Sequence, residues 1–164
     1  MTFEKKKQIL KIIIVILLIV FIILFISTRS KLGNLSESPL KNYSLSYNNL
    51  DGALNSGDET IFIFSYTGDK NVHNNEAEIA SEIKSYNLQD NIKYVDITQY
   101  KDNSNFINEL NTKFSLNENY SIKKLPAIIY YANGAAVYTI DSSEVLINSG
   151  SIAQIADMYF TKEE

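Results

Sequence analysis

The chain contains no cysteine among its 164 residues. This absence excludes disulfide bonds, thiol–disulfide exchange, zinc sites built on thiolates and lipid attachment through a cysteine. Histidine occurs once, as His73, and the sequence has no G-x-S-x-G motif, which would mark a serine nucleophile. The composition therefore removes thiol chemistry and leaves a single imidazole for any other catalysis.

Positive charge is scarce outside the N-terminal segment. Residues 1–31 carry a net charge of +5, whereas residues 32–164 carry −9. Proteins that bind nucleic acids neutralise phosphates with clustered Lys and Arg. The acidic body of the chain therefore argues against a nucleic-acid partner.

One long apolar run lies near the N-terminus. Residues 12–26 are uninterrupted apolar sequence, and Ile9 and Leu10 extend it beyond Lys11. As a helix, the 18 residues 9–26 span about 27 Å, close to the roughly 30 Å hydrocarbon core of a bilayer. Basic residues are more numerous before this run than after it, which places the N-terminus in the cytoplasm and the body outside.

We therefore predict a cytoplasmic basic tail at residues 1–8 and a single-pass transmembrane signal anchor in the cell membrane at residues 9–28. A cleaved signal peptide is the alternative. Against it, the apolar run is long for such a peptide, and residues 25–29 contain no A-x-A-like cleavage site.

Residues 29–43 are polar, which predicts a tether. The pattern of residues 44–164 predicts one extracellular α/β domain. Its expected elements are, in order, a helix over 45–55, a strand over 61–64, a helix over 70–86 capped by Asp69, a strand over 92–97, a helix over 105–114, a hairpin over 127–140 and a helix over 152–159 capped by Ser151. A strand–helix–strand unit followed by a hairpin gives a mixed sheet with helices on both faces.

The hairpin is the most distinctive part of the sequence. Pro126 cannot donate to a strand ladder and so stands at the threshold of its first strand. Asn133-Gly134 supplies the two residues that tolerate positive φ in a tight turn. Alternation places Tyr130 and Tyr131 on opposite faces, which predicts one of them in the core and leaves the other for the surface.

This order of elements, from about Leu45 to Phe160, resembles the thioredoxin superfamily. The matching stretches are Ile61–Phe64, Ser65–Gly68, the helix from Lys70, Ile92–Ile97, and Leu125-Pro126 with Asn133-Gly134. The chain looks most similar to small extracytoplasmic thioredoxin-like proteins of low-GC Gram-positive bacteria, including bacteriocin transport accessory proteins. The resemblance implies a thioredoxin-like sheet and a Pro126 that corresponds to the cis-proline beside which a partner's backbone pairs in relatives.

The chain departs from this family at the redox site. The positions of the family's Cys-x-x-Cys fall on Asp69 and Val72, and neither side chain can form the thiolate that thiol–disulfide exchange requires. The sequence therefore predicts a protein that is not a thiol–disulfide enzyme. The resemblance instead implies a binding surface at the degenerate site, made by Asp69, Val72, Leu125 and Pro126.

No metal or cofactor is expected. None of the Asp-rich turns fits the calcium-loop pattern D-x-[DN]-x-[DN]-G. Glu76 and Glu78 flank a His73 that lacks the further ligands of an imidazole-rich site, and we interpret His73 as a surface residue. The acidic residues of this helix are typical of a solvated face.

Three functions remain open on the sequence. The first is a membrane-tethered binding or accessory protein that holds an extended peptide or an envelope protein, in bacteriocin or peptide export by resemblance. The second is a non-thiol enzyme, for example a hydrolase, that uses Asp69, His73 or Glu76. The third is a structural subunit of an envelope secretion or conjugation complex, with contacts made by the anchor itself.

Overall fold

The computed structural model describes residues 14–20, 38–66 and 68–160. The chain divides into two compact units, residues 1–34 and 35–164. In the first unit, residues 14–20 form a helix with exposed side chains. Within the described residues, no helix is both long and apolar enough to cross a membrane. The predicted basic tail at 1–8, and most of the predicted anchor at 9–28, lie outside the described residues.

The second unit contains four strands and four α-helices among its described residues, with short 3₁₀ turns between them. In chain order they are η2 Lys41–Tyr43, η3 Tyr47–Asn49, α2 Leu50–Asn55, β1 Thr60–Ser65, α3 Lys70–Ser85, β2 Ile92–Asp96, η4 Thr98–Tyr100, α4 Phe106–Lys113, β3 Ala127–Ala132, β4 Ala135–Asp141 and α5 Ser149–Tyr159. The predicted order of elements is therefore confirmed, and the packed domain includes Leu40, whose side chain is fully buried.

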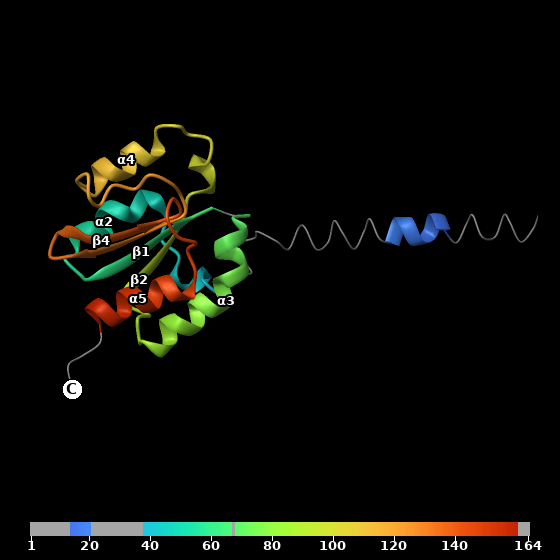
Figure 1. Cartoon of the computed structure of the whole chain (residues 1–164), viewed down its shortest axis with the longest axis horizontal. Coiled ribbons are helices and arrows are strands. Elements are labelled where there is room, and N and C mark those ends of the chain that lie inside the picture. The colour runs from blue at the N-terminus through green and yellow to red at the C-terminus, as the bar shows by residue number, and fades with distance from the viewer. Residues whose placement is uncertain (1–13, 21–37, 67, 161–164) are drawn as a thin grey trace, which may run out of the picture. The chain divides into compact units, whose positions relative to one another are not determined.

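The strands form one mixed sheet in the order β2-β1-β3-β4. Strands β1 and β2 are parallel, with Ile63 opposite Tyr94. Strand β3 is antiparallel to both of its neighbours, β1 and β4. Helices α3 and α5 cover one face of the sheet and α2 and α4 cover the other (Figure 1).

Strand β1 lies in the middle of the domain and is buried along its whole length. Ile61 and Ile63 belong to the apolar cluster under α3 and α5. Phe62 and Phe64 belong to the cluster under α2 and α4. Residues 61–64 of β1 are apolar on both faces, as a sheet covered on both faces requires, so the sequence-based interpretation of this strand is confirmed.

The hairpin forms as predicted. Asn133 and Gly134 connect β3 to β4 with φ values of +53° and +78°, the conformation that a two-residue type I′ turn needs. The turn's twist matches the twist of the two strands. It therefore sets the pairing next to the turn, of Ala132 with Ala135, whereas Ile129 pairs with Thr139 only after a register shift at Tyr130 and Tyr131.

The predicted helix at 45–55 needs correction, because α2 begins only at Leu50. Upstream, Ser44 forms an isolated parallel bridge with Tyr94, and the Leu45 N–H donates to the Tyr94 carbonyl over 2.8 Å. The backbone at these two residues is used to extend the sheet beside β2, so it cannot enter a helix there.

The predicted cap of the last helix is also wrong. Asn148, not Ser151, is the N-cap of α5, because its side chain accepts a hydrogen bond from the Ser151 N–H. The Ser151 hydroxyl accepts in return from the Asn148 N–H. Together they form a capping box, in which the serine stands one turn inside the helix.

The prediction for the tyrosine pair was half right. Tyr130 and Tyr131 do lie on opposite faces of the sheet. Both are buried, however, with 3% and 9% of their surface exposed. Tyr131 packs edge-on against Phe62 and Phe114, because helices cover that face of the sheet as well.

Candidate functional site

The candidate site lies where β1 ends and α3 begins. The chain leaves β1 at Ser65, turns through Tyr66 and Gly68, and enters α3 after Asp69. Gly68 has a φ of +88°, which a residue with a side chain rarely adopts. This turn presents the N-terminus of α3 at the end of the central strand.

Asp69 is the N-cap of α3, as predicted. Its Oδ1 atom accepts hydrogen bonds from the backbone N–H groups of Asn71 and Val72, each over 3.0 Å. The carboxylate is 8% exposed and satisfies helix donors that would otherwise lack partners. Asp69 thus places a carboxylate acceptor against the N-terminus of α3.

Val72 lies one turn into α3 and points into the core. It is 1% exposed and belongs to the apolar cluster beneath α3 and α5. Its side chain therefore supports the helix start from beneath. The sequence predicted Val72 as part of a binding surface, but its side chain is buried in the core and so is not accessible to a partner.

Leu125 and Pro126 form the other wall of the site. The peptide bond between them is cis, and Pro126 directly precedes β3. Pro126 is buried, whereas Leu125 is half-buried and packs against the cluster beneath α2 and α4. Among residues 38–66 and 68–160, the backbone N–H and C=O of Leu125 make no hydrogen bond.

Asp141, at the end of β4, holds the segment that leads to Leu125. Its Oδ2 atom accepts from the backbone N–H groups of Lys123 and Lys124, over 2.5 and 3.2 Å. Its Oδ1 atom accepts from the Ser143 N–H over 2.8 Å. Partial burial alone would raise the pKa of Asp141, but these hydrogen bonds to the charged form outweigh it and lower the pKa.

A groove of about 340 Å³ adjoins this wall, and both Tyr66 and Leu125 line it. Its other walls come from the β2–α4 connection and from α4: Ile97, Tyr100, Lys101, Asn103, Ser104, Phe106 and Ile107. The stacked rings of Tyr100 and Phe106, with centroids 4.7 Å apart, give it an aromatic wall. Sequence reasoning missed this groove, whose one local signal is a tyrosine directly after β1.

Tyr66 connects the groove to the helix cap. The Lys101 ammonium lies 5.4 Å from the centre of the Tyr66 ring, within the range of a cation–π contact. Partial burial, together with the nearby Asp69 carboxylate, raises the pKa of the Tyr66 hydroxyl. Tyr66 therefore stays neutral across the physiological pH range and offers a ring and a hydroxyl to the groove.

A small polar cluster lies beneath the start of α3. Glu76 is 7% exposed, and its Oε1 lies 3.6 Å from Nδ1 of His73, which is only partly exposed. Burial raises the pKa of the nearby Tyr94 hydroxyl, even though the Ser65 hydroxyl acts in the opposite direction. The Ser65 Oγ makes no hydrogen bond of standard geometry within the described residues.

The structure separates the predicted site residues into two groups. Asp69 and Val72 frame the helix start, while Leu125 lines the groove beside Tyr66. His73 is brought to the carboxylate of Glu76, which is the orienting partner that a catalytic histidine requires. Within the described residues, no group of three acidic or histidine side chains could hold a metal ion.

These features define the class of fold. A mixed four-stranded sheet with the order β2-β1-β3-β4 has helices on both faces. A helix starts after the central strand, and a cis-proline precedes the antiparallel neighbour of that strand. The domain has a thioredoxin-like fold, and it has no cysteine.

Comparison with solved structures agrees with this assignment. The chain is similar to oxidised thioredoxin O2 from Arabidopsis thaliana, with a TM-score of 0.50 and 11% identity, over 74% of this chain and 97% of that one. It also matches a putative oxidoreductase with a thioredoxin fold (TM-score 0.46, 14% identity, 72% and 96% covered). A third match is oxidised thioredoxin from Plasmodium falciparum (TM-score 0.45, 14% identity, 72% and 97% covered). At 11% identity the likeness to thioredoxin O2 shows the fold alone, and the other two likenesses, with TM-scores below 0.5, add nothing to it.

No protein-family model matches the chain, and no curated protein matches it either.

Proposed function

We propose that this chain is a redox-inactive binding protein that holds an extended peptide at the site left by the lost thiols. The observation that carries the proposal is the state of Asp69. Its carboxylate is bonded to the N–H groups of Asn71 and Val72, so the helix N-terminus is already occupied by the protein's own acceptor. By resemblance, position 69 holds the reactive cysteine in thioredoxins, whereas in this chain the Asp69 side chain caps α3 and stabilises the helix start.

The groove beside Leu125 supplies the binding surface in this proposal. The backbone N–H and C=O of Leu125, which make no hydrogen bond within the described residues, offer one donor and one acceptor to an extended chain, the pairing used in strand addition. A volume of about 340 Å³ is at the small end of ligand pockets and suits one or two apolar side chains of the peptide. Tyr66 and Tyr100 provide rigid aromatic walls, which are favoured at peptide-binding surfaces.

We further propose that the apolar segment at 9–28 tethers the domain to the outer side of the cell membrane. The support is the sequence: residues 9–26 are apolar except for Lys11, and basic residues precede them. A tether raises the concentration of the domain near membrane-bound partners such as an exporter. By resemblance to bacteriocin transport accessory proteins, we assign the role to the export of a bacteriocin or another peptide.

In-cell crosslinking of the tagged full-length chain, followed by mass spectrometry, tests this function. The test variant is Tyr66→Ala, which removes one wall of the groove. The matched control is Tyr120→Ala, because Tyr120 is 36% exposed and does not line the groove. We expect an exporter component or a secreted peptide to be recovered with the wild type and the control, and lost with Tyr66→Ala. A recovery that is the same in all three would refute the proposal.

One observation favours a second candidate, a non-thiol enzyme. His73 lies 3.6 Å from the buried carboxylate of Glu76, an arrangement that can orient an imidazole for proton transfer. We place this candidate second because Asp69, one of the three residues that it could use, is already bonded to the helix backbone. A cellular phenotype that is unchanged by His73→Ala would exclude the enzyme.

A structural subunit of an envelope complex is the remaining alternative. Replacing residues 9–26 by an unrelated anchor separates it from the proposed binding protein, because only the structural subunit depends on contacts made by its own anchor.

A further inference from the structure

Strand β4 is an edge of the described sheet, and its hydrogen-bond pattern shows which groups face outward. The Ser142 N–H donates to the Pro126 carbonyl over 3.0 Å. In an antiparallel ladder, hydrogen-bonded pairs alternate with non-bonded pairs. Ile140 and Tyr138, opposite Ile128 and Tyr130, therefore bond to β3. Thr139 directs its N–H and C=O away from β3, to the open edge.

This edge has little of the protection that sheet edges usually carry. Natural edges are blunted by lysine, by proline or by a bulge. The sequence of β4 is AAVYTID, and its one charged residue, Asp141, is the last. The edge does carry one irregularity, because the register shift opposite Tyr130 and Tyr131 leaves Val137 without a partner residue, but from Tyr138 to Asp141 the pairing with β3 is regular. The middle of β4 is therefore able to pair with another strand.

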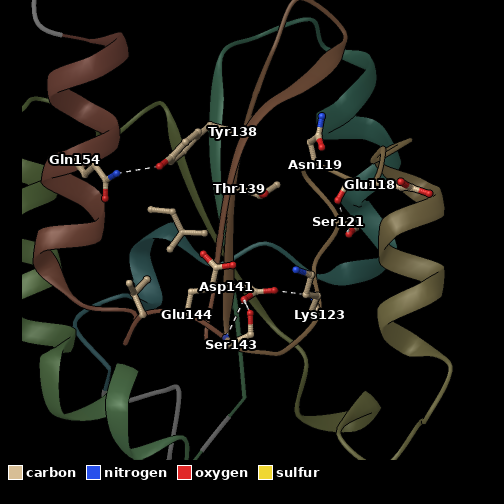
Figure 2. Close-up of a pocket in the computed structure, with 12 residues that line it drawn as sticks. Glu118, Asn119, Ser121, Lys123, Tyr138, Thr139, Asp141, Ser143, Glu144 and Gln154 are labelled. Atoms are coloured by element: carbon tan, nitrogen blue, oxygen red, sulfur yellow. Dashed lines mark hydrogen bonds between the residues drawn. The ribbon is translucent and has the colours of Figure 1, made fainter.

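A trough of about 190 Å³ lies along this same part of β4. Tyr138, Thr139 and Asp141 line its floor, and the loop 118–123 lines one side. On the other side, Gln154 of α5 donates to the Tyr138 hydroxyl over 2.9 Å. Figure 2 shows β4 running between these two flanks, with Thr139 at its middle. The open backbone edge is thus the floor of a depression, which has the form expected of a strand-docking site.

The charges around the trough indicate what could lie in it. Glu118 and Glu144 both line it and are exposed, and Lys123 is the one basic residue of its lining. Asp141 adds a third carboxylate, although backbone N–H groups already surround it. A second copy of the chain would bring the same carboxylates into the trough, whereas a basic segment would pair with them.

We propose that the edge of β4 docks an extended, lysine- or arginine-bearing segment of another protein, which pairs with Thr139 and places its basic side chains near Glu118 and Glu144. This surface is distinct from the groove at Tyr66 and Leu125. The protein would then hold two extended segments at once, one beside Pro126 and one along β4.

The test measures the binding of a synthetic probe to the full-length chain in a neutral detergent, by fluorescence anisotropy. The probe is a labelled peptide of about eight residues, near the length of a strand, in which lysine alternates with threonine and valine. One control peptide replaces each lysine by glutamate. The other carries a central proline, which cannot pair as a strand.

The main variant is Thr139→Pro, which removes the outward N–H and leaves the hydrogen bonds to β3 in place. We expect it to weaken binding of the basic peptide by about tenfold, since it deletes a backbone hydrogen bond and puts a ring in the trough. Thr139→Ala keeps the N–H and should bind as the wild type does. Thermal melts of both variants confirm that the fold is retained.

A second variant keeps the proposal testable if Thr139→Pro does not fold. Glu118→Gln with Glu144→Gln should weaken binding about fivefold, as expected for two exposed ion pairs, and should reduce its dependence on salt. Glu78→Gln with Asp102→Asn changes the net charge equally at exposed positions outside the trough and should have no effect.

Several results would overturn the proposal: no binding of the basic peptide, equal binding of the acidic peptide, or indifference to both variants. A dimer in sedimentation that Thr139→Pro dissociates would instead make a second copy the occupant. Tyr66→Ala should leave binding of this probe unchanged, because its groove is separate. Loss of the proposed function at Tyr66 and loss of this second surface are therefore distinguishable.

Discussion

The sharpest stability prediction concerns Asp69. Asp69→Ala removes the acceptor of two backbone hydrogen bonds, each 3.0 Å long, from Asn71 and Val72. Loss of an N-cap costs about 0.5–2 kcal/mol. The Val72 N–H, beneath a side chain that is 1% exposed, would also lose its partner without easy access to water. We therefore expect the free energy of unfolding to fall by about 2 kcal/mol, at the upper end of the range for caps.

For a domain of this size, that loss corresponds to a fall in Tm of about 6–10 °C. The assay is thermal unfolding of the full-length chain, followed by the near-ultraviolet circular dichroism of its tyrosines. Asp69→Asn is the matched control, because asparagine caps helices about as well as aspartate and should stay within about 0.5 kcal/mol of the wild type. The reasoning fails if Asp69→Ala leaves Tm unchanged, or if Asp69→Asn costs as much as Asp69→Ala.

Three further predictions follow from the same region and from the sheet. Asp69→Cys with Val72→Cys should create a thiol pair at a helix N-terminus, where the thiolate is favoured. We expect this double variant, unlike the wild type, to reduce disulfides in an insulin turbidity assay. No gain of activity would show that this fold no longer supports thiol–disulfide exchange. Asp141→Ala should lower Tm by a few degrees at neutral pH, because it removes the acceptor of several hydrogen bonds, including the one from the Lys123 N–H. Hydrogen bonds to a charged acceptor contribute about 1–2 kcal/mol at a partly exposed site. Because the pKa of Asp141 is lowered in the folded state, this stabilisation is present above the ordinary pKa of aspartate and is lost as the pH falls through the folded pKa, so the wild type and the variant should converge in acid. Burial, with Glu59 nearby, raises the pKa of Tyr130 to about 12. The unfolded chain therefore releases this proton at a lower pH than the folded chain, and the free energy of unfolding should fall as the pH rises above about 10. In thermal melts at alkaline pH, Tyr130→Phe should show a smaller fall of Tm with pH than the wild type, and an equal fall would contradict the raised pKa of Tyr130.

Much of the fold is local in origin and could be predicted. The Asn133-Gly134 turn occupies the positive φ values that a two-residue hairpin needs, and this is a property of the two residues themselves. Asp69 caps α3 through bonds to residues two and three positions along. Such features depend on neighbours in the sequence, so the sequence alone contains them.

The sequence-based predictions were wrong where the conformation or burial of a residue depends on a segment far away in the sequence. Leu45 would fit a helix, but its N–H bonds to Tyr94 in β2, which favours an extended backbone. Tyr131 alternates with Tyr130 as expected, but the helices on the second face of the sheet bury it to 9% exposure. Local pattern cannot say whether a face is covered, because the covering helix lies elsewhere in the chain.

The sequence by itself determined the loss of thiol chemistry, the order of the elements, the capped helix at Asp69 and the hairpin behind Pro126. Tertiary structure alone decided where the groove and the trough lie, the two surfaces that we propose for binding. Tyr66, Tyr100 and Leu125 meet in one groove, and Thr139 faces a trough beside Glu118, although these residues are far apart along the chain. The reason is physical: a cap or a turn is an interaction between sequence neighbours, whereas a groove exists only once the sheet and its helices have packed.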